Sequence, residues 1–288
     1  MKHLFILKST KKDYEFGEHI HDIMKDYDYE IIYSHSSKET REVIQKLKVP
    51  TRIYCVGGDG TLNNMVQDIV NTSHELVVVP LGTGNDFCRL LTPVKDPLDV
   101  VKQSLSHPVC KIDTIQLNDK YYVNATCFGV DKVIGNHVHD TMHVPLVPES
   151  KSYLVSIMQN VFKYQFDEVV IEADGKIVYQ GCITLCTVNN GQYYGGGFRI
   201  TPQAKIVDGY MDICVVEKVP KAKIPYLLGY LISGNLHKRK EVHFFKAKHV
   251  KVIINGSSNM DGERYKNSDY CFKILPQSLN LVTNYQDI

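Results

Sequence analysis

The sequence contains no tryptophan, no long apolar run and no excess of charge of either sign. Its 288 residues carry 33 Lys and Arg against 32 Asp and Glu, a formal net charge of +1. This balance gives no reason to expect a nucleic-acid partner, which favours a basic excess. The apolar start is too short for a signal peptide, and no run of about 18 apolar residues predicts a membrane span. We therefore expect a cytoplasmic protein, at most peripheral at the inner face of a membrane.

The eight cysteines show no metal-binding or redox pattern. No Cys-x-x-Cys pair occurs, and most of the cysteines stand inside apolar runs. Such cysteines are typical of buried, reduced thiols, so we expect neither disulfides nor a zinc site. His137, His139 and His143 form a cluster, but no Cys or further His stands at the usual zinc spacing. The role of this cluster is left open.

Two common phosphate-binding signatures are also missing. The chain has neither the GxxxxGK[ST] pattern nor the HRD and DFG motifs of protein kinases. Instead, the glycine-rich segment VGGDGTLN at 56–63 joins an apolar run to a helical segment. Glycines let the backbone approach a phosphate, and the free N–H groups of the next helix favour an anion. Asp59 would repel that phosphate unless a cation lay between them, so the segment predicts Mg²⁺ and a nucleotide. The alternative is a tight turn that binds nothing.

The first 105 residues alternate short apolar runs with helical periods, which is the pattern of a parallel sheet with crossover helices. Ligands of such sheets bind beyond the carboxyl ends of the strands. A second glycine-rich segment, PLGTGNDF at 80–87, follows the next strand, with Asn85 or Asp86 as the expected helix cap. We predict strands at 4–7, 30–33, 52–56 and 76–80, and helices near 13–26, 38–47, 62–71 and 86–105.

From about Cys110 the pattern changes to short β-runs, with turn signals at 174–175, 208–209 and 255–256. Helical stretches are expected at 150–164 and 221–236, and the second is apolar on most faces, as in a buried helix or one that lines an acyl-chain pocket. We therefore predict an α/β + β fold. A doubly wound α/β nucleotide-binding domain, residues 1–115, precedes a mainly antiparallel β-sandwich or barrel domain, residues 116–288.

The two glycine-rich segments together resemble the diacylglycerol kinase catalytic-domain family, which includes bacterial lipid kinases and the sphingosine kinases. Further matching segments follow in order: NATCFGVD at 124–131, NGQYYGGGF at 190–198, PQAKIVDGYM at 202–211 and DGE at 261–263. The resemblance implies ATP-dependent transfer of the γ-phosphate to the hydroxyl of a lipid, diacylglycerol-like, in a cleft between the two domains.

The resemblance also implies a role for each matching residue. ATP would bind Gly57, Gly58, Asp59, Gly60, Thr61, Leu62, Asn63, Thr83 and Asn85. The catalytic Mg²⁺ would lie among Asp59, Asp86 and Asp113. The general base would be Asp261, with Glu263 beside it. A second, structural Mg²⁺ would be held by the loop of Lys205, Asp208 and Tyr210, mostly through main-chain oxygens plus the carboxylate of Asp208.

The chain departs from the family at its first turn. Where the family has an Asn-Pro turn, this chain reads LKSTK at 7–11, so Ser9, Thr10 or Lys11 would have to supply the nucleotide contact. The family has a Thr after the second strand, and here Ser34, His35 or Ser36 would take its place.

Other functions remain open at this point. An NAD kinase would share the GGDGT segment, and a non-catalytic nucleotide or lipid sensor would tolerate the altered first turn. The acidic set argues against a sensor, which has little need of it. The basic stretch 237–251 is either a solvated surface or a face for anionic lipid. The sequence leaves the identity of the lipid and a homodimer undecided.

Overall fold

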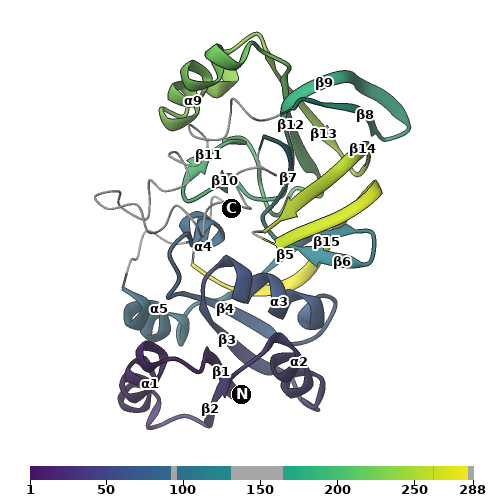
Figure 1. The fold of residues 1–288 in the computed structure, drawn as a ribbon. Coiled ribbons are helices and arrows are strands. Elements are labelled where there is room, and N and C mark those ends of the chain that lie inside the picture. The colour runs from purple at the N-terminus through teal and green to yellow at the C-terminus, as the bar shows by residue number, and fades with distance from the viewer. Residues whose placement is uncertain (92–95, 131–164, 262, 285–288) are drawn as a thin grey trace.

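The computed structural model describes residues 1–91, 96–130, 165–261 and 263–284. In this part of the chain, one continuous sheet of 13 strands runs through two lobes, which Figure 1 shows one above the other. The first lobe contains the N-terminal residues with most of the helices, and the second is mainly β-structure. The predicted fold class is confirmed.

The first lobe is built on four parallel strands in the order β4-β3-β1-β2. All four predicted strands are present, and alternate residues point to opposite faces of the sheet. In β3, Ile53 packs toward α2 and α3, whereas Tyr54 packs toward α1 and α5. The elements are β1 (Lys2–Lys8), α1 (Lys11–Met24), β2 (Tyr29–Ser34), α2 (Ser37–Gln45), β3 (Thr51–Gly57), α3 (Asp59–Ile69) and β4 (Glu75–Pro80).

The single helix predicted over 86–105 is wrong, because two helices occupy this range. They are α4 (Asp86–Leu91) and α5 (Pro97–Ser104), and residues 92–95 lie outside the described chain. A new helix begins at Pro97 because the side chain of Asp96 accepts a hydrogen bond from Leu98 N. Proline at the first helical position has no N–H to leave unsatisfied.

Within the described residues, the second lobe contains antiparallel strands and one short α-helix, α9 (Ile224–Ile232). Its strands are β5 (Val109–Leu117), β6 (Lys120–Tyr122), β7 (Ala125–Gly129), β8 (Asp167–Ala173), β9 (Lys176–Asn189), β12 (Met211–Glu217), β13 (Val242–Ala247), β14 (His249–Met260) and β15 (Glu263–Val282). A separate two-stranded hairpin is formed by β10 (Tyr193–Tyr194) and β11 (Phe198–Arg199).

Two of the predicted turns can be compared directly with the structure. Asp174 and Gly175 both have positive φ and form the expected hairpin between β8 and β9. Residues 255–256, predicted as a turn, instead lie inside β14 where its register with β15 shifts. This Asn-Gly pair therefore belongs to a β-bulge.

Strand β15 connects the two lobes. It pairs with β5 in antiparallel orientation and, at Asn280 and Leu281, with β4 in parallel orientation. Leu279 and Leu281 are buried in the core of the first lobe. The domain division at residue 115 stays a prediction. The end of β15 packs in the core of the first lobe, although it belongs to the predicted second domain.

The predicted helix over 221–236 is shorter in the structure. A 3₁₀ turn at Lys221–Lys223 leads into α9 (Ile224–Ile232), and a second 3₁₀ turn follows at Leu236–Lys238. The helix predicted over 150–164 and the cluster of His137, His139 and His143 lie outside the described residues. Among the helices that the structure describes, none has the length and apolar character needed to cross a membrane.

Candidate active site

The two glycine-rich segments pack directly against each other beyond the ends of β3 and β4. Leu81 N and Gly82 N donate hydrogen bonds to Gly57 O, at 3.0 and 3.2 Å. A Cβ on Gly82 would lie 2.4 Å from Gly58 Cα. Glycine is therefore needed at position 82 for contact between the loops, in addition to the phosphate approach that the sequence predicts. Leu62, predicted as an ATP contact, is instead buried in the core.

Asp59 links the first loop to the helix that follows the second. Its carboxylate accepts hydrogen bonds from Asp86 N at 3.1 Å and Phe87 N at 3.3 Å, so it caps α4. Asn85, one of the two predicted caps, stands at the N-cap position, where its carbonyl accepts a hydrogen bond from Arg89 N at 3.0 Å, but the side chain that caps the helix is that of Asp59. Asn85 has positive φ and donates its side-chain amide to Gly82 O at 2.6 Å. Glycine at position 84 leaves room for Asp59, because a Cβ there would lie 2.9 Å from Asp59 Oδ2.

Asp86 is a buried carboxylate with one unsatisfied oxygen. Its Oδ2 accepts a hydrogen bond from Gly196 N at 2.9 Å, whereas its Oδ1 has no hydrogen-bond partner and lies 3.7 Å from Arg89 Nε. Burial, and then the charge of Asp59, raise the pKa of Asp86 to about 6. A buried carboxylate whose pKa is raised by a second carboxylate, and which has one oxygen without a hydrogen bond, fits a divalent cation.

The described residues offer few further side-chain ligands for a cation beside Asp59 and Asp86. Among the described residues, no group of three or more His, Cys, Asp or Glu side chains is arranged to hold a metal. Magnesium is commonly bound by one or two carboxylates together with water and substrate phosphates. Thr61 Oγ1 and Asn85 Oδ1 are also buried without a hydrogen-bond partner. These polar atoms on the two loops are available to a bound group.

Asp113, predicted to join Asp59 and Asp86 at the catalytic Mg²⁺, forms hydrogen bonds with other segments. Its Oδ1 accepts a hydrogen bond from Gln277 N at 2.8 Å, and its Oδ2 accepts one from Gly209 N at 2.7 Å. Gln277 has positive φ and stands where the register between β5 and β15 shifts. Burial raises the pKa of Asp113, and Asp208 raises it further. Asp113 therefore fixes the bulge of β15 to the loop of Asp208, instead of joining Asp59 and Asp86.

A cationic side chain of strand β13, Lys246, lies beside the loop predicted to hold a second Mg²⁺. Asp208 Oδ1 accepts a hydrogen bond from Tyr210 N at 3.0 Å, and its Oδ2 lies 2.5 Å from Lys246 Nζ. The same ammonium lies 3.3 Å from Asp212 Oδ2. Lys205 is exposed. The sequence predicts a magnesium ion here, and the structure places the ammonium of Lys246 beside these carboxylates instead. The Asp208 carboxylate therefore does not fit a second divalent cation while the ammonium of Lys246 is paired with it.

Asp261 is buried at the turn between β14 and β15. Its carboxylate accepts hydrogen bonds from Ala125 N at 2.7 Å, Val123 N at 3.2 Å and Asn124 N at 3.3 Å. Burial raises the pKa of Asp261 to about 7 against these bonds, and the charge of Asp59 acts in the same direction. A carboxylate with a pKa near 7 is suited to general-base catalysis. Glu263 begins β15, and its side chain lies outside what the structure describes.

A cavity of about 470 Å³ opens at the carboxyl ends of β1 and β2, beside the start of α3. The strand order reverses between β1 and β3, and ligands of such sheets bind at this point. Ser9 and Thr10 line the cavity with Gly60 and Thr61, as do all three residues considered for the second strand end. Lys11 does not line this cavity, and its Nζ lies 3.9 Å from Glu15 Oε1. Thr10 also caps α1 by accepting from Asp13 N.

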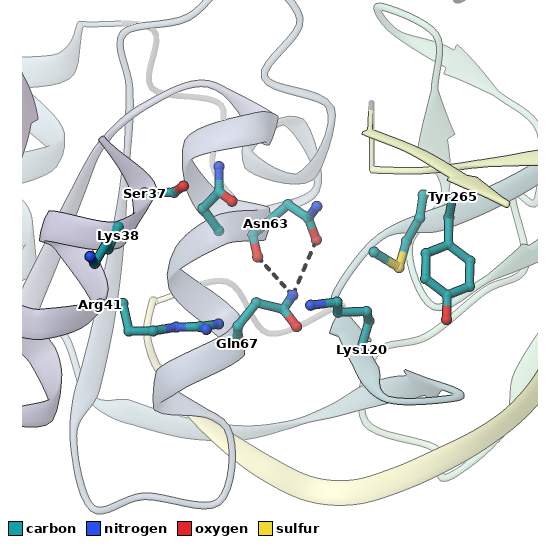
Figure 2. Close-up of a pocket in the computed structure, with 9 residues that line it drawn as sticks. Ser37, Lys38, Arg41, Asn63, Gln67, Lys120 and Tyr265 are labelled. Atoms are coloured by element: carbon teal, nitrogen blue, oxygen red, sulfur yellow. Dashed lines mark hydrogen bonds between the residues drawn. The ribbon is translucent and has the colours of Figure 1, made fainter. Parts of the chain in front are cut away.

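A second cavity, of about 510 Å³, lies between the lobes and adjoins the first at Ser37 and Asn64. Figure 2 shows Lys38 of α2 and Lys120 of β6 on either side of it, with Asn63 on α3 and Tyr265 on β15. Asn63, predicted as an ATP contact, therefore faces this space. The two lysines were not predicted, because no motif marks them and only the fold brings them to one cleft.

Comparison with known proteins gives consistent matches along the chain. A family model described as "Diacylglycerol kinase catalytic domain" matches residues 7–117, and "YegS C-terminal NAD kinase beta sandwich-like domain" matches residues 124–283. The diacylglycerol kinase of Bacillus subtilis is 29% identical over 216 residues, which cover 73% of this chain and 70% of that protein.

Solved structures share the fold. A crystal structure of a diacylglycerol kinase from Bacillus anthracis has a TM-score of 0.75 and 20% identity, over 98% of this chain and 96% of that one. The crystal structure of an NAD kinase from Archaeoglobus fulgidus in complex with ATP has a TM-score of 0.56 and 13% identity, over 100% and 94% of the two chains.

Proposed function

This chain belongs to the family in which a diacylglycerol kinase catalytic domain is followed by a YegS-type C-terminal domain, and we propose that it is an ATP-dependent lipid kinase. It transfers the γ-phosphate of ATP to the hydroxyl of a diacylglycerol-like lipid. The observation that carries this proposal is the joining of the two glycine-rich loops through Asp59, which places its carboxylate beside that of the buried Asp86.

ATP binds, in this proposal, in the cavity at the ends of β1 and β2. Gly57, Gly58 and Gly60 form the backbone of its phosphate site, and the buried hydroxyl of Thr61 is free to donate to a phosphate oxygen. Thr83 and Asn85 bring the second loop to the same site. Lys38 and Lys120 add positive charge from both lobes at the adjoining cavity, which favours an anionic nucleotide.

Asp59 and Asp86 are the residues that would hold Mg²⁺ beside the phosphates. When bound, the ion would neutralise charge that develops on the transferred group. Asp86 supplies Oδ1, which has no hydrogen-bond partner and lies 3.7 Å from Arg89 Nε, and Gly196 N holds its other oxygen in place. Asp59 is oriented by the two amides at the start of α4.

Asp261 is the proposed general base, which accepts the proton of the lipid hydroxyl. Three backbone N–H groups fix the orientation of its carboxylate. Each carboxylate oxygen has two lone pairs, so acceptor capacity remains after these bonds. Glu263 is proposed as its neighbour in the site. The lipid reaches the enzyme from a membrane surface, so we propose peripheral association with the membrane.

The proposal is tested by transfer of radiolabelled phosphate from ATP to a panel of lipids in mixed micelles, with NAD as a parallel acceptor. We expect a labelled lipid product that depends on Mg²⁺ and on the surface concentration of the lipid. Labelling of NAD with every lipid left unlabelled would establish an NAD kinase instead. ATP binding without transfer to any acceptor would establish a sensor.

A further inference from the structure

Helix α9 is apolar on its exposed face as well as on its buried face. Ile224, Leu227 and Leu231 are buried against the second lobe. On the other side, Tyr226 is 49% exposed and Ile232 is 55% exposed. A helix on a solvated surface normally presents polar residues outward. The outward apolar residues of α9 therefore favour contact with a partner of apolar character.

The segments on either side of α9 are strongly basic. Residues 218–240 contain six Lys or Arg and no Asp or Glu. Lys238 and Lys240, which follow the helix, are exposed. Among the described residues, the acid that forms ion pairs with these segments is the buried Glu241. Its Oε1 lies 2.5 Å from Lys223 Nζ, and its Oε2 lies 3.5 Å from Arg239 Nε. Glu241 thus holds the two basic segments together without neutralising the exposed lysines.

Arg239 and two tyrosines form the junction between the apolar and the basic parts. The guanidinium carbon of Arg239 lies 5.1 Å from the centre of the Tyr226 ring and 4.9 Å from that of Tyr230. Its Nη1 donates to the hydroxyl of Tyr226 at 3.2 Å. Tyrosine and arginine side chains with an apolar body and a polar tip are suited to a boundary between water and an apolar phase.

A single hairpin separates this surface from the proposed active site. Phe198 of β11 shares a hydrophobic cluster with Leu227 and Leu231 of α9. Gly196, between β10 and β11, donates its N–H to Asp86 Oδ2. Figure 1 shows the hairpin between α9 and α4. A partner seated on α9 would therefore lie on the side of the second lobe that contacts Asp86.

We propose that α9 and its basic flanks, residues 221–240, are the surface by which the protein docks on an anionic lipid bilayer. Tyr226 and Ile232 enter the boundary between headgroups and acyl chains, and Lys238 and Lys240 contact lipid phosphates. An apolar helix face bordered by lysines is the pattern of helices that lie in a membrane interface. This inference rests on the proposed function, because a lipid acceptor is what brings the protein to a bilayer.

Docking is tested without ATP, by sedimentation of the full chain with vesicles of phosphatidylcholine and phosphatidylglycerol. We expect Tyr226→Ser/Ile232→Ser to bind about tenfold more weakly, because apolar groups no longer enter the interface. Lys238→Gln/Lys240→Gln should bind about fivefold more weakly for each charge removed, with a smaller effect at high salt. The matched control is Ile177→Ser, which removes a residue that is 64% exposed on β9 and should leave binding unchanged.

Kinase activity separates docking from catalysis. With a short-chain, water-soluble diacylglycerol, the α9 variants should transfer phosphate as the wild type does, whereas with vesicles they should lose activity in proportion to binding. Thermal melts confirm that they fold. The proposal is overturned if wild-type protein does not sediment with anionic vesicles, or if Tyr226→Ser/Ile232→Ser binds them as well as wild type. If wild type binds vesicles through α9 but phosphorylates no lipid, docking stands and the proposed function fails.

Discussion

The carboxylate of Asp59 accepts a hydrogen bond from the backbone N–H of Asp86 at 3.1 Å, across 27 residues of sequence. A candidate metal ligand on the first glycine-rich loop therefore also caps the helix that begins the second. The site and the local fold share this contact, so changes at Asp59 affect both chemistry and stability.

Asp59→Asn should nearly abolish transfer while the protein stays folded. Asparagine keeps a carbonyl that accepts from one amide of α4, so the loss of stability should be about 1 kcal/mol. Loss of the charge at the metal should lower kcat by a factor of about 100 or more. Steady-state kinetics and a thermal melt measure the two effects. Asp174→Asn, at a hairpin turn where Asp174 accepts from Lys248 N and His249 N, is the control and should remain active. Activity of Asp59→Asn within about threefold of wild type would remove Asp59 from the metal site.

Gly82→Ala should destabilise the protein and weaken ATP binding. Its Cβ would lie 2.4 Å from Gly58 Cα, a backbone atom that can give way only if the two loops separate. We expect a loss of about 1 to 3 kcal/mol in urea unfolding, with a higher Kd for ATP. Gly229→Ala is the control, because nothing lies within 4 Å of its Cβ, and in a helix it should gain up to about 1 kcal/mol. Unchanged stability of Gly82→Ala would mean that the loops are not in contact.

Lys246→Met should destabilise the protein by about 2 kcal/mol, because it leaves Asp208 and the buried Asp212 without their cation. Burial raises the pKa of Asp212 and Lys246 opposes this shift, so the loss should grow as pH rises and Asp212 must ionise. Urea unfolding at several pH values measures it. The control is Lys251→Met, whose partner Asp269 is exposed and whose loss should destabilise the protein less than that of Lys246.

Metal binding provides a second test of the Lys246 position. Mg²⁺ should raise the melting temperature of Lys246→Met, in which a cation can replace the ammonium. A wild-type crystal soaked in Mn²⁺ should show no anomalous peak beside Asp208 and Tyr210. Such a peak in wild type would restore the second magnesium site that the sequence predicts.

Activity should rise with pH up to about 7 and then level off, because Asp261 accepts a proton only when ionised and its pKa is raised to about 7. A pH profile of kcat/KM at saturating Mg²⁺ measures this. Asp261→Asn should lose transfer over the whole range. A wild-type profile that is flat between pH 5 and 8, or that falls toward pH 8, would contradict the assignment of Asp261 as base.

The same pKa shift predicts a change of stability with pH. The folded-state pKa of Asp261, about 7, lies above the ordinary value of 3.8. The folded protein therefore retains a proton that the unfolded chain releases. This contribution is fully present below the ordinary value and is lost as pH rises through the folded pKa. Urea unfolding should show a fall in stability in this window for wild type that Asp261→Asn lacks.

The sequence determined the parallel strands of the first lobe, the two glycine-rich loops and the family. Strand and helix periods are local, and a motif such as GGDGTLN at 57–63 needs only neighbouring residues to be recognised. The start of a second helix within 86–105 is also a local signal, carried by the cap Asp96 and by Pro97. The apolar period continues across it and favours a single helix.

Only the tertiary structure decided which charged groups meet. Asp113 contacts Gln277 across 164 residues of sequence, and Lys246 contacts Asp208 across 38. Lys38 and Lys120 line one cavity only because the two lobes lie on opposite sides of it. Electrostatic interactions depend on distance in space, which the order of residues does not give, so the partner of each carboxylate follows from the packing of the lobes.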